Sequence, residues 1–387
     1  MKQYEVNWKR LLLLLGILLV LLIVLGLLVR GCTKAACSKN SGTIAVVTPP
    51  PTPAPTCIDL YAYYEWTETV RITVYDHRAD KLLEMDLEAY ILGVVAAEMP
   101  ASYSFEALKA QAVASRTYAL YNIAHGGSAA HPDAAVCTSS ACCQAYADAD
   151  RLRARWGDDY VANYNKVAAA VMETAGEVLV YNGSLIDALY HACSGGMTED
   201  SEHIYANAIP YLRGVESPYE TPMREDDVSF AFADAAALLA AKYPDAGVTE
   251  ENIKDMLAIV ETYPSGRVAQ VRVGNTTITG KQLRGVFSLD STMFTLTWSE
   301  DGIVFHTKGY GHGVGLSQNG ANGMAQQGAS YQDILLHYYT GVALVPYASL
   351  DASAKPVSAE PVETPSPAVT DAPSPSASSG GVLVPAD

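Results

Sequence analysis

The sequence has little positive charge. Its 387 residues include 25 lysines and arginines against 42 aspartates and glutamates, which gives a formal net charge of −17 at pH 7. Nucleic acids need a basic protein face, and anionic lipid head groups likewise attract cations. The acidic balance therefore argues against both partners. Phenylalanine is also scarce, with 6 residues against 24 tyrosines. Tyrosines in such numbers fit sugar stacking in an extracellular enzyme, although most of them will be structural.

Two widespread catalytic motifs are missing. The glycine-rich stretch GYGHGVGLSQ, residues 309–318, lacks the GxxxxGK(S/T) pattern of a nucleotide loop. No G-x-S-x-G elbow is present, which argues against a serine hydrolase that would join His312 to Ser317 or Ser194. Glycines at alternate positions let backbone N–H groups face a ligand. We therefore interpret His312 and Gln318 as polar groups of a substrate cleft.

Cysteine is sparse, and the 7 thiols cannot all pair within one monomer because their number is odd. Cys32, Cys37 and Cys57 lie near the N-terminus, and the sequence does not decide which of them pair.

Three of the other cysteines lie in one loop, HPDAAVCTSSACCQAY. Its possible metal ligands are His131, Cys137, Cys142 and Cys143. These groups could converge on tetrahedral Zn²⁺, and four protein ligands would make the metal structural because no position stays open for water. The spacing matches no common zinc finger. A local disulfide with one free thiol is the alternative, which an extracytoplasmic location favours.

The first 69 residues are predicted to anchor and space the domain that follows. Residues 11–29 are an unbroken run of Leu, Ile, Val and Gly, long enough to span a bilayer at about 1.5 Å per residue. Arg30 follows directly and no A-x-A cleavage site is present, which favours an uncleaved transmembrane helix. Residues 1–10 are predicted to be cytoplasmic, and residues 30–69 a proline-rich extracytoplasmic linker.

Residues 86–127 predict two helices with a sharp break between them. Asp86 is a suitable N-cap for the first helix, and Pro100 ends it because proline lacks an N–H and restricts the residue before it. Glu98 therefore lies at the carbonyl end of a helix among apolar neighbours, where its pKa should be raised. The second helix, which Ser104 could cap, brings Lys109 and Arg116 to one face.

Patterns elsewhere predict an α+β fold. Strands are predicted over residues 70–75, 82–85, 177–181, 185–191, 258–263, 268–273 and 276–279, and helices over 160–175, 229–243, 249–257 and 331–339. The Asn182-Gly183 pair is predicted to join the strands at 177–181 and 185–191 into a hairpin. The loop Ser194, Gly195 and Gly196 follows, where glycines let the backbone approach a ligand. Residues 347–387 are predicted to be a disordered Pro/Ser/Ala-rich acidic tail.

The stretch YILGVVAAEMPASYSFEALKAQAVASRTYAL, which contains Glu98, resembles the signature of the SpoIID/LytB domain family, named for stage II sporulation protein D. Further stretches agree in the family's order: CTSSACCQAY, YHACSGGMTED, PYLRGVESP and GYGHGVGLSQNGANGMAQQGASYQDILLHYYTG. The resemblance covers roughly Val70 to Pro346, so residues 70–346 are predicted to form one domain. It implies a two-lobed α+β domain around a cleft.

The resemblance implies that Glu98 is the catalytic residue of a peptidoglycan lytic transglycosylase, which cleaves the MurNAc–GlcNAc bond and leaves a 1,6-anhydro sugar. Arg116 and Lys109 could orient the substrate or tune Glu98, and the sequence does not show which; we assign Arg116 to catalysis and Lys109 to substrate binding. The loop at residues 194–196 would line the glycan cleft. Some members of the family hold a metal with His and Cys in the cysteine loop, where Cys142 would stand in place of a His.

The resemblance also implies that the substrate is glycan stripped of its stem peptides, and that a cell-wall amidase is a partner in the engulfment machinery of a spore former. The protein would then sit in the cell membrane as a single-pass protein with its catalytic domain outside. Relatives of the LytB type are described as enhancers of an amidase. A non-catalytic, cell-wall-binding enhancer is therefore the alternative function.

Overall fold

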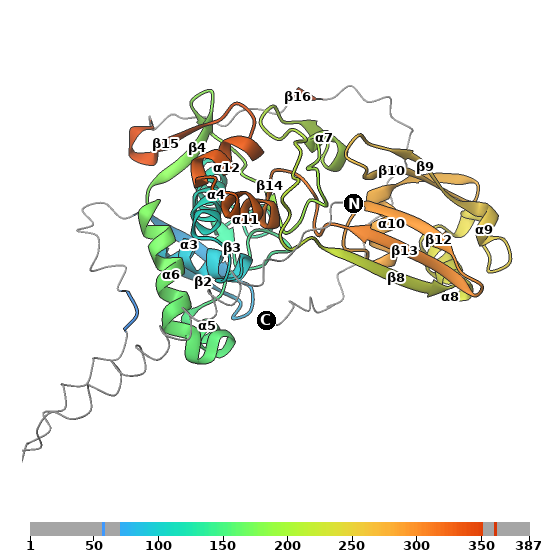
Figure 1. Ribbon diagram of the computed structural model, residues 1–387, viewed down its shortest axis with the longest axis horizontal. Helices are drawn as coiled ribbons and strands as arrows, with labels where there is room; N and C mark the ends of the chain where they lie inside the picture. Colours follow the sequence, from blue (N-terminus) through green and yellow to red (C-terminus); the bar gives the residue numbers. More distant parts are fainter. Residues whose placement is uncertain (1–55, 59–69, 351–359, 362–387) are drawn as a thin grey trace, which may run out of the picture. The chain divides into compact units, whose positions relative to one another are not determined.

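The computed structural model describes residues 56–58, 70–350 and 360–361. Helices and several small sheets alternate along the chain, which confirms the predicted α+β class (Figure 1). The predicted anchor at residues 11–29, most of the linker and most of the tail lie outside the described residues. Within the described part, no helix is long and apolar enough to cross a membrane.

A long central helix, α4 (Phe105–Ala124), organises the first hydrophobic cluster. It packs against α3 (Leu87–Glu98), α6 (Tyr160–Glu173), α11 (Gln318–Gln326) and α12 (Tyr331–Tyr338). Close packing is possible because the buried residues of α4 include the small side chains of Ala107, Ala110, Ala112 and Ala114. This arrangement places the middle of both predicted central helices in the core.

The boundaries of α3 follow from its sequence. The Asp86 carboxylate caps it, accepting hydrogen bonds from the backbone N–H groups of Glu88 (3.0 Å) and Ala89 (3.4 Å), as predicted. The helix ends at Glu98, before Pro100. Ser104 was predicted to cap α4 with its side chain, and this is wrong: its hydroxyl caps nothing, and its backbone N–H donates to the Asn322 side chain (2.9 Å).

Three small sheets accompany this cluster. β1 (Arg71–Asp76) pairs with β2 (Lys81–Asp86) and β3 (Val136–Cys137). β4 (Glu177–Tyr181) pairs with β5 (Ser184–Leu185) across the predicted Asn-Gly turn and with β15 (Ala343–Pro346). The predicted strand at 185–191 is interrupted. Its last part, β6 (Tyr190–His191), pairs in parallel with β14 (Leu316–Ser317), which brings two glycine-rich loops together.

Residues 225–308 build a second hydrophobic cluster from two three-stranded sheets and their helices. The sheets contain β8 (Glu225–Ala231), β12 (Met293–Trp298) and β13 (Gly302–Lys308), and β9 (Leu257–Thr262), β10 (Val268–Val273) and β11 (Thr276–Thr279). The helices are α8 (Phe232–Lys242), α9 (Ile253–Met256) and α10 (Gly280–Phe287). The hairpin β4–β5 and Leu316 of β14 belong to the first cluster together with α3 and α4, so the two clusters do not separate these parts, and the two lobes with a cleft stay a prediction.

Two helices were predicted too long in this region. The helix predicted from residue 229 begins at Phe232, because Ser229 belongs to β8 and pairs with Val304 of β13. The helix predicted over 249–257 is reduced to the single turn α9, because Leu257 starts β9. The remaining elements are α5 (Ala149–Trp156), α7 (Ser201–Ile204), β7 (Asn207–Ala208), β16 (Glu360–Pro361) and 3₁₀ turns at Gly157–Asp159, Pro244–Ala246 and Tyr347–Ser349.

Candidate active site

The Glu98 carboxyl group lies at the C-terminal end of α3 and is partly exposed. Its Oε1 accepts hydrogen bonds from the backbone N–H of Ala145 (2.6 Å) and from the Tyr190 hydroxyl (3.3 Å), and the Gln318 side chain also bonds to the carboxyl group. Desolvation raises the pKa of Glu98, although these hydrogen bonds act in the opposite direction. The protonated form of Glu98 is therefore more populated near neutral pH than it would be for a carboxyl group in bulk water, which suits a general acid.

The partners of Glu98 are themselves fixed by a buried polar network. The Gln144 amide donates to the Tyr190 hydroxyl (3.0 Å) and accepts from the Tyr90 hydroxyl (3.2 Å). On the other side, the Gln318 amide donates to Gln111 Oε1 (3.2 Å). Sequence reasoning missed Tyr190 and Gln144, although both stand in stretches that carry the family resemblance. Because the donors are held in place, Glu98 has one defined orientation.

The cysteine loop, residues 131–146, contains Ala145 near its end. The structure joins Cys137 and Cys142 in a disulfide and leaves Cys143 as a thiol. Ligand atoms of His131, Cys137 and Cys142 lie within 4.8 Å of one another, so these side chains form a possible metal-binding group. Cys143 is not part of that group, but its Sγ lies 3.5 Å from that of Cys142. One imidazole and two thiolates suit Zn²⁺ when the cysteines are reduced.

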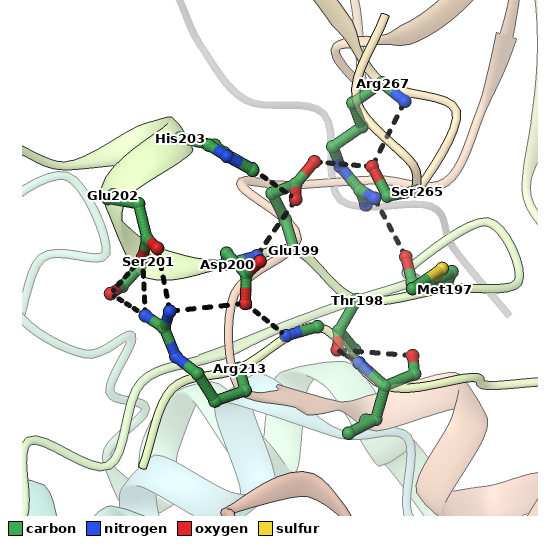
Figure 2. A network of polar contacts seen from close by, with 12 residues as sticks. Met197, Thr198, Glu199, Asp200, Ser201, Glu202, His203, Arg213, Ser265 and Arg267 are labelled. Atoms are coloured by element: carbon green, nitrogen blue, oxygen red, sulfur yellow. Dashed lines mark hydrogen bonds and ion pairs between the residues drawn. The ribbon is translucent and has the colours of Figure 1, made fainter. Parts of the chain in front are cut away.

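A buried polar network connects the second cluster to the loops around the glycine motifs (Figure 2). Arg267 is fully buried and donates to the backbone oxygens of Ser194 (2.7 Å) and Met197 (2.8 Å). Glu199 accepts from Ser265 and contacts the His203 ring (2.8 Å). These bonds fix the chain just after β6, the strand that carries Tyr190.

Packing explains why two of the motif glycines are needed. A side-chain carbon added at Gly313 would lie 2.4 Å from the Arg267 guanidinium, and at Gly195 it would lie 2.8 Å from Sδ of Met293. Both residues also have a positive φ, 86° and 82°. We expected these glycines to give a ligand close access to the backbone. In the structure, the missing side chains instead let these loops pack closely against Arg267 and Met293 of the second cluster.

Comparison with known proteins was consistent with the motifs. A family model described as SpoIID, Stage II sporulation protein, matches residues 75–181. Stage II sporulation protein D of Bacillus subtilis (strain 168) is 33% identical over 277 residues, which cover 71% of this chain and 79% of that protein. The chain belongs to the SpoIID family. Stage II sporulation protein D of Bacillus amyloliquefaciens is 35% identical over 278 residues, 70% of this chain and 78% of that protein.

The amidase enhancer of Bacillus subtilis (strain 168) is also similar. It is 30% identical over 304 residues, which cover 66% of this chain but only 40% of the enhancer. The SpoIID model match includes Glu98 and the cysteine loop, whereas Tyr190 and Gln318 lie beyond its end. The site at Glu98 is therefore completed by chain segments outside the matched part.

Arg116 was predicted to take part in catalysis, and the structure places it elsewhere. Its guanidinium is 0% exposed and donates two hydrogen bonds to the Glu88 carboxylate, at 2.7 and 2.6 Å. It also donates to the backbone oxygens of Glu177 (3.2 Å) and Val171 (3.3 Å). A side chain enclosed in this way cannot contact a substrate, so we assign Arg116 a structural role in SpoIID packing.

Lys109 is likewise occupied by protein partners. Its ammonium group lies 3.0 Å from Glu106 and 3.2 Å from Glu173, and 4.6 Å from the centre of the Tyr331 ring. No hydrogen bond or ion pair of the described residues joins it to Glu98 or to the donors around Glu98. A role for Lys109 in substrate binding is not visible in this arrangement.

Ser194 also departs from its prediction. Its side chain is 0% exposed, and its hydroxyl bonds to Glu220, whose Oε1 also accepts from Ser217 (2.8 Å) and Ser317 (2.7 Å). A buried hydroxyl cannot line a glycan surface. Gly196, by contrast, has open space where a side chain would be.

Two predicted polar groups remain, of which Gln318 is buried, at 5% exposed, and His312 is partly exposed. Gln318 bonds to Glu98, as described above. The His312 ring is partly exposed and lies 5.5 Å from the His191 ring and 6.0 Å from the Tyr205 ring, measured between centres. Burial lowers the pKa of His312 to about 4, so its imidazole is neutral at pH 7. Its Nδ1 accepts a hydrogen bond from the backbone N–H of Val314 (3.1 Å), so the neutral ring carries its proton on Nε2, which can donate a hydrogen bond.

Proposed function

We propose that this SpoIID-family protein is a peptidoglycan lytic transglycosylase in which Glu98 is the acid and base. The observation that carries the proposal is the environment of this one carboxyl group: partly exposed, raised in pKa by desolvation and held by Ala145, Tyr190 and Gln318. Among the described residues, none of the groups bonded to Glu98 is a carboxylate. Ordinary glycosidases need a second carboxylate, whereas a reaction with an internal nucleophile does not.

The geometry suggests how the acid would work. Ala145 and Tyr190 both donate to Oε1 of Glu98, so the proton of the neutral acid belongs on Oε2. Protonated Glu98 would donate that proton to the glycosidic oxygen between MurNAc and GlcNAc. The resulting carboxylate would then accept the proton of the MurNAc C6 hydroxyl as its oxygen attacks the anomeric carbon. No water enters, and the product carries a 1,6-anhydro ring.

We further propose that His131, Cys137, Cys142 and Cys143 would hold a structural Zn²⁺ when these thiols are reduced; the ligand atoms of the first three lie within 4.8 Å of one another, and the Cys143 Sγ lies 3.5 Å from that of Cys142. Such an ion would fix the loop that leads to Ala145. It has no part in the proton transfers. The disulfide seen in the structure would fix the same loop in an oxidising location.

The setting of the reaction is also part of the proposal. We expect a single-pass cell-membrane protein, anchored by residues 11–29, with the catalytic domain outside and a cell-wall amidase as partner that removes stem peptides from the glycan. The similarity to an amidase enhancer favours a second candidate, a non-catalytic wall-binding enhancer. The two differ in whether the purified protein alone cleaves glycan.

The test replaces Glu98 with glutamine, which keeps the shape of the side chain but cannot donate or accept the proton. Turnover of peptide-free glycan strands should fall about 10²–10⁴-fold. Glu300→Gln, at an exposed position in the second cluster, is the matched control and should keep wild-type turnover. Near-normal turnover by a folded Glu98→Gln protein would show that the acid is elsewhere.

A further inference from the structure

The Tyr190 hydroxyl has several partners but only one proton. Its oxygen lies 3.3 Å from Oε1 of Glu98 and 3.0 Å from Nε2 of Gln144. The Ser115 hydroxyl also bonds to it, and that hydroxyl accepts from Gln111 (2.9 Å), which leaves its own proton for Tyr190. A phenol donates a single hydrogen bond, so Tyr190 donates to Glu98 only while its other partners are donors. The orientation of the Gln144 amide therefore decides whether the acid keeps this bond.

A backbone carbonyl fixes the orientation of this amide. The Nε2 of Gln144 also lies 3.5 Å from the backbone oxygen of Ser115, which can only accept a hydrogen bond. The amide atom that faces both Ser115 and Tyr190 must therefore be the nitrogen. The Tyr90 hydroxyl donates to the other side of the amide, Oε1, at 3.2 Å. The hydrogen bonds consequently run in one direction, from the amide to Tyr190 and from Tyr190 to Glu98.

The Gln144 amide is enclosed by the protein. Gln144 is 1% exposed, and Tyr90 and Ser115 are 0% exposed. Rotating the amide would place its oxygen against the Ser115 oxygen and leave buried polar groups without partners, which is costly. A side chain in this position cannot contact a glycan. Gln144 can therefore affect a reaction at Glu98 only through the groups that it holds in place.

Ala145, the second donor to Oε1 of Glu98, depends on the same contacts. It follows Gln144 in the chain, and its backbone N–H donates to Oε1 at 2.6 Å. The next residue, Tyr146, stacks on the Tyr90 ring with 5.7 Å between the ring centres and 8° between the planes. Tyr90 thus holds both neighbours of Ala145, one through its hydroxyl and one through its ring. Because Tyr90 and Glu98 both belong to α3, these contacts fix the loop against the helix that carries the acid.

We propose that Gln144 is a positioning residue for the reaction at Glu98. It keeps the Tyr190 hydroxyl and the Ala145 N–H on Oε1, so that Oε2 is the oxygen left to carry the proton to the glycosidic bond. This role rests on the proposed function, in which Glu98 is the acid. Gln144 itself touches neither the glycan nor the reacting atoms.

Loss of the Gln144 amide should change the pH dependence of cleavage. The hydrogen bonds on Oε1 favour the carboxylate form and act against the desolvation that raises the pKa of Glu98. Without them the pKa of Glu98 should rise further, by about one unit for a hydrogen bond to a charged group. Cleavage needs the protonated acid, so the falling limb of the kcat/KM profile at high pH should move upwards by about one unit in Gln144→Met.

The experiment measures cleavage of peptide-free glycan strands by full-length protein in detergent, between about pH 5 and pH 9. In Gln144→Met, kcat should fall about 10–100-fold because the acid loses its fixed orientation. KM should stay within about twofold of the wild-type value, because Gln144 makes no contact with the substrate. Gln270→Met, at an exposed position of β10 in the second cluster, is the matched control and should keep the wild-type profile.

Further variants separate positioning from packing. Tyr190→Phe removes the donor itself, and its combination with Gln144→Met should move the limb by less than the sum of the single shifts, because both changes act on one chain of hydrogen bonds. Tyr90→Phe keeps the ring and removes only the hydroxyl that holds Gln144, so it should move the limb in the same direction by a smaller amount. It decides the matter if Gln144→Met does not fold. A limb that stays at the wild-type pH in the folded variants would overturn the proposal.

A readout that needs no cleavage distinguishes this role from the proposed function. A water-soluble carbodiimide modifies protonated carboxyl groups, and peptide mass spectrometry follows the modification of Glu98 against pH. Its midpoint should rise by about one unit in Gln144→Met. If wild-type protein cleaves no glycan but this midpoint shifts, the control of Glu98 by Gln144 stands and the transglycosylase proposal fails. If cleavage is normal and neither the midpoint nor the limb shifts, the positioning role alone fails.

Discussion

Replacing Arg116 with methionine should destabilise the protein strongly, because it would leave a charged partner without its counterion. The Glu88 carboxylate is 5% exposed and accepts both of its closest hydrogen bonds from Arg116, at 2.7 and 2.6 Å. Its remaining described donor is the backbone N–H of Gly176, at 3.3 Å. Removing one partner of a buried ion pair typically costs about 3–5 kcal/mol, because the other charge stays desolvated.

The loss of folding stability can be measured as a decrease in melting temperature. In domains somewhat smaller than this one, each kcal/mol shifts the midpoint by roughly 2–4 °C, so Arg116→Met should melt ~6–20 °C lower than the wild type. Lys308→Met is the control. Lys308 forms a 3.0 Å pair with Glu225 in which both side chains are more than half exposed, at 57% and 58%. Exposed pairs contribute at most about 1 kcal/mol, so its midpoint should shift little.

A double variant separates structure from chemistry. Arg116→Met combined with Glu88→Leu replaces the ion pair by apolar side chains, and it should recover much of the lost stability. If Arg116 is structural, this folded variant should cleave glycan at close to the wild-type rate. A stable double variant whose turnover has fallen about 10²–10⁴-fold would refute the reasoning and return Arg116 to the reaction. A single variant that melts like the wild type would also refute it.

Further predictions concern Asp187, the cysteine loop and the anchor. The folded-state pKa of Asp187, which lies between β5 and β6, is about 6, above its ordinary value of 3.8, so the protein loses stability as pH rises between these two values, where the unfolded state releases the proton first. Asp187→Asn should therefore stabilise the protein at pH 7.5 but not at pH 4. The gain at pH 7.5 should be ~1–2 kcal/mol, which allows for the partial exposure of Asp187. Equal melting midpoints of the wild type and Asp187→Asn at pH 7.5 would contradict this. Protein purified under reducing conditions should bind about one Zn²⁺ per chain and melt at a lower temperature after chelation. Substoichiometric metal together with an intact Cys137–Cys142 disulfide would refute the zinc site and leave the disulfide as the link in this loop. Full-length protein should remain in the membrane fraction, and a mature form beginning near Cys32 would show that residues 11–29 are a cleaved signal.

Local sequence rules were sufficient for the position of the acid. Asp86, the apolar run of α3 and Pro100 each act over one or two turns of chain, and together they place Glu98 at the helix end. The same is true of the Asn-Gly hairpin, where Asn182 and Gly183 take positive φ values of 49° and 80°. Such features depend on neighbours in sequence, which a single chain displays directly.

What surrounds the acid could not be predicted in this way. Tyr190 reaches Glu98 only because β6 pairs with β14, and this contact joins parts of the chain far apart in sequence. Helical position alone likewise could not tell that Arg116 is enclosed, because its partners Glu88 and Val171 lie on other helices. Ser229 was placed in a helix because its pairing with β13 is invisible to local propensity.

The most direct test of the account is the chemical form of the ends that purified protein produces from peptide-free glycan strands. Reaction in heavy-oxygen water followed by mass spectrometry reads both the mass and the origin of the oxygen. An internal nucleophile predicts anhydro-muramyl ends that are lighter by one water than hydrolysis products and carry no label, and Glu98→Gln should produce none of them. Labelled reducing ends from the wild type would show a hydrolase and would contradict the single-carboxyl mechanism assigned to Glu98.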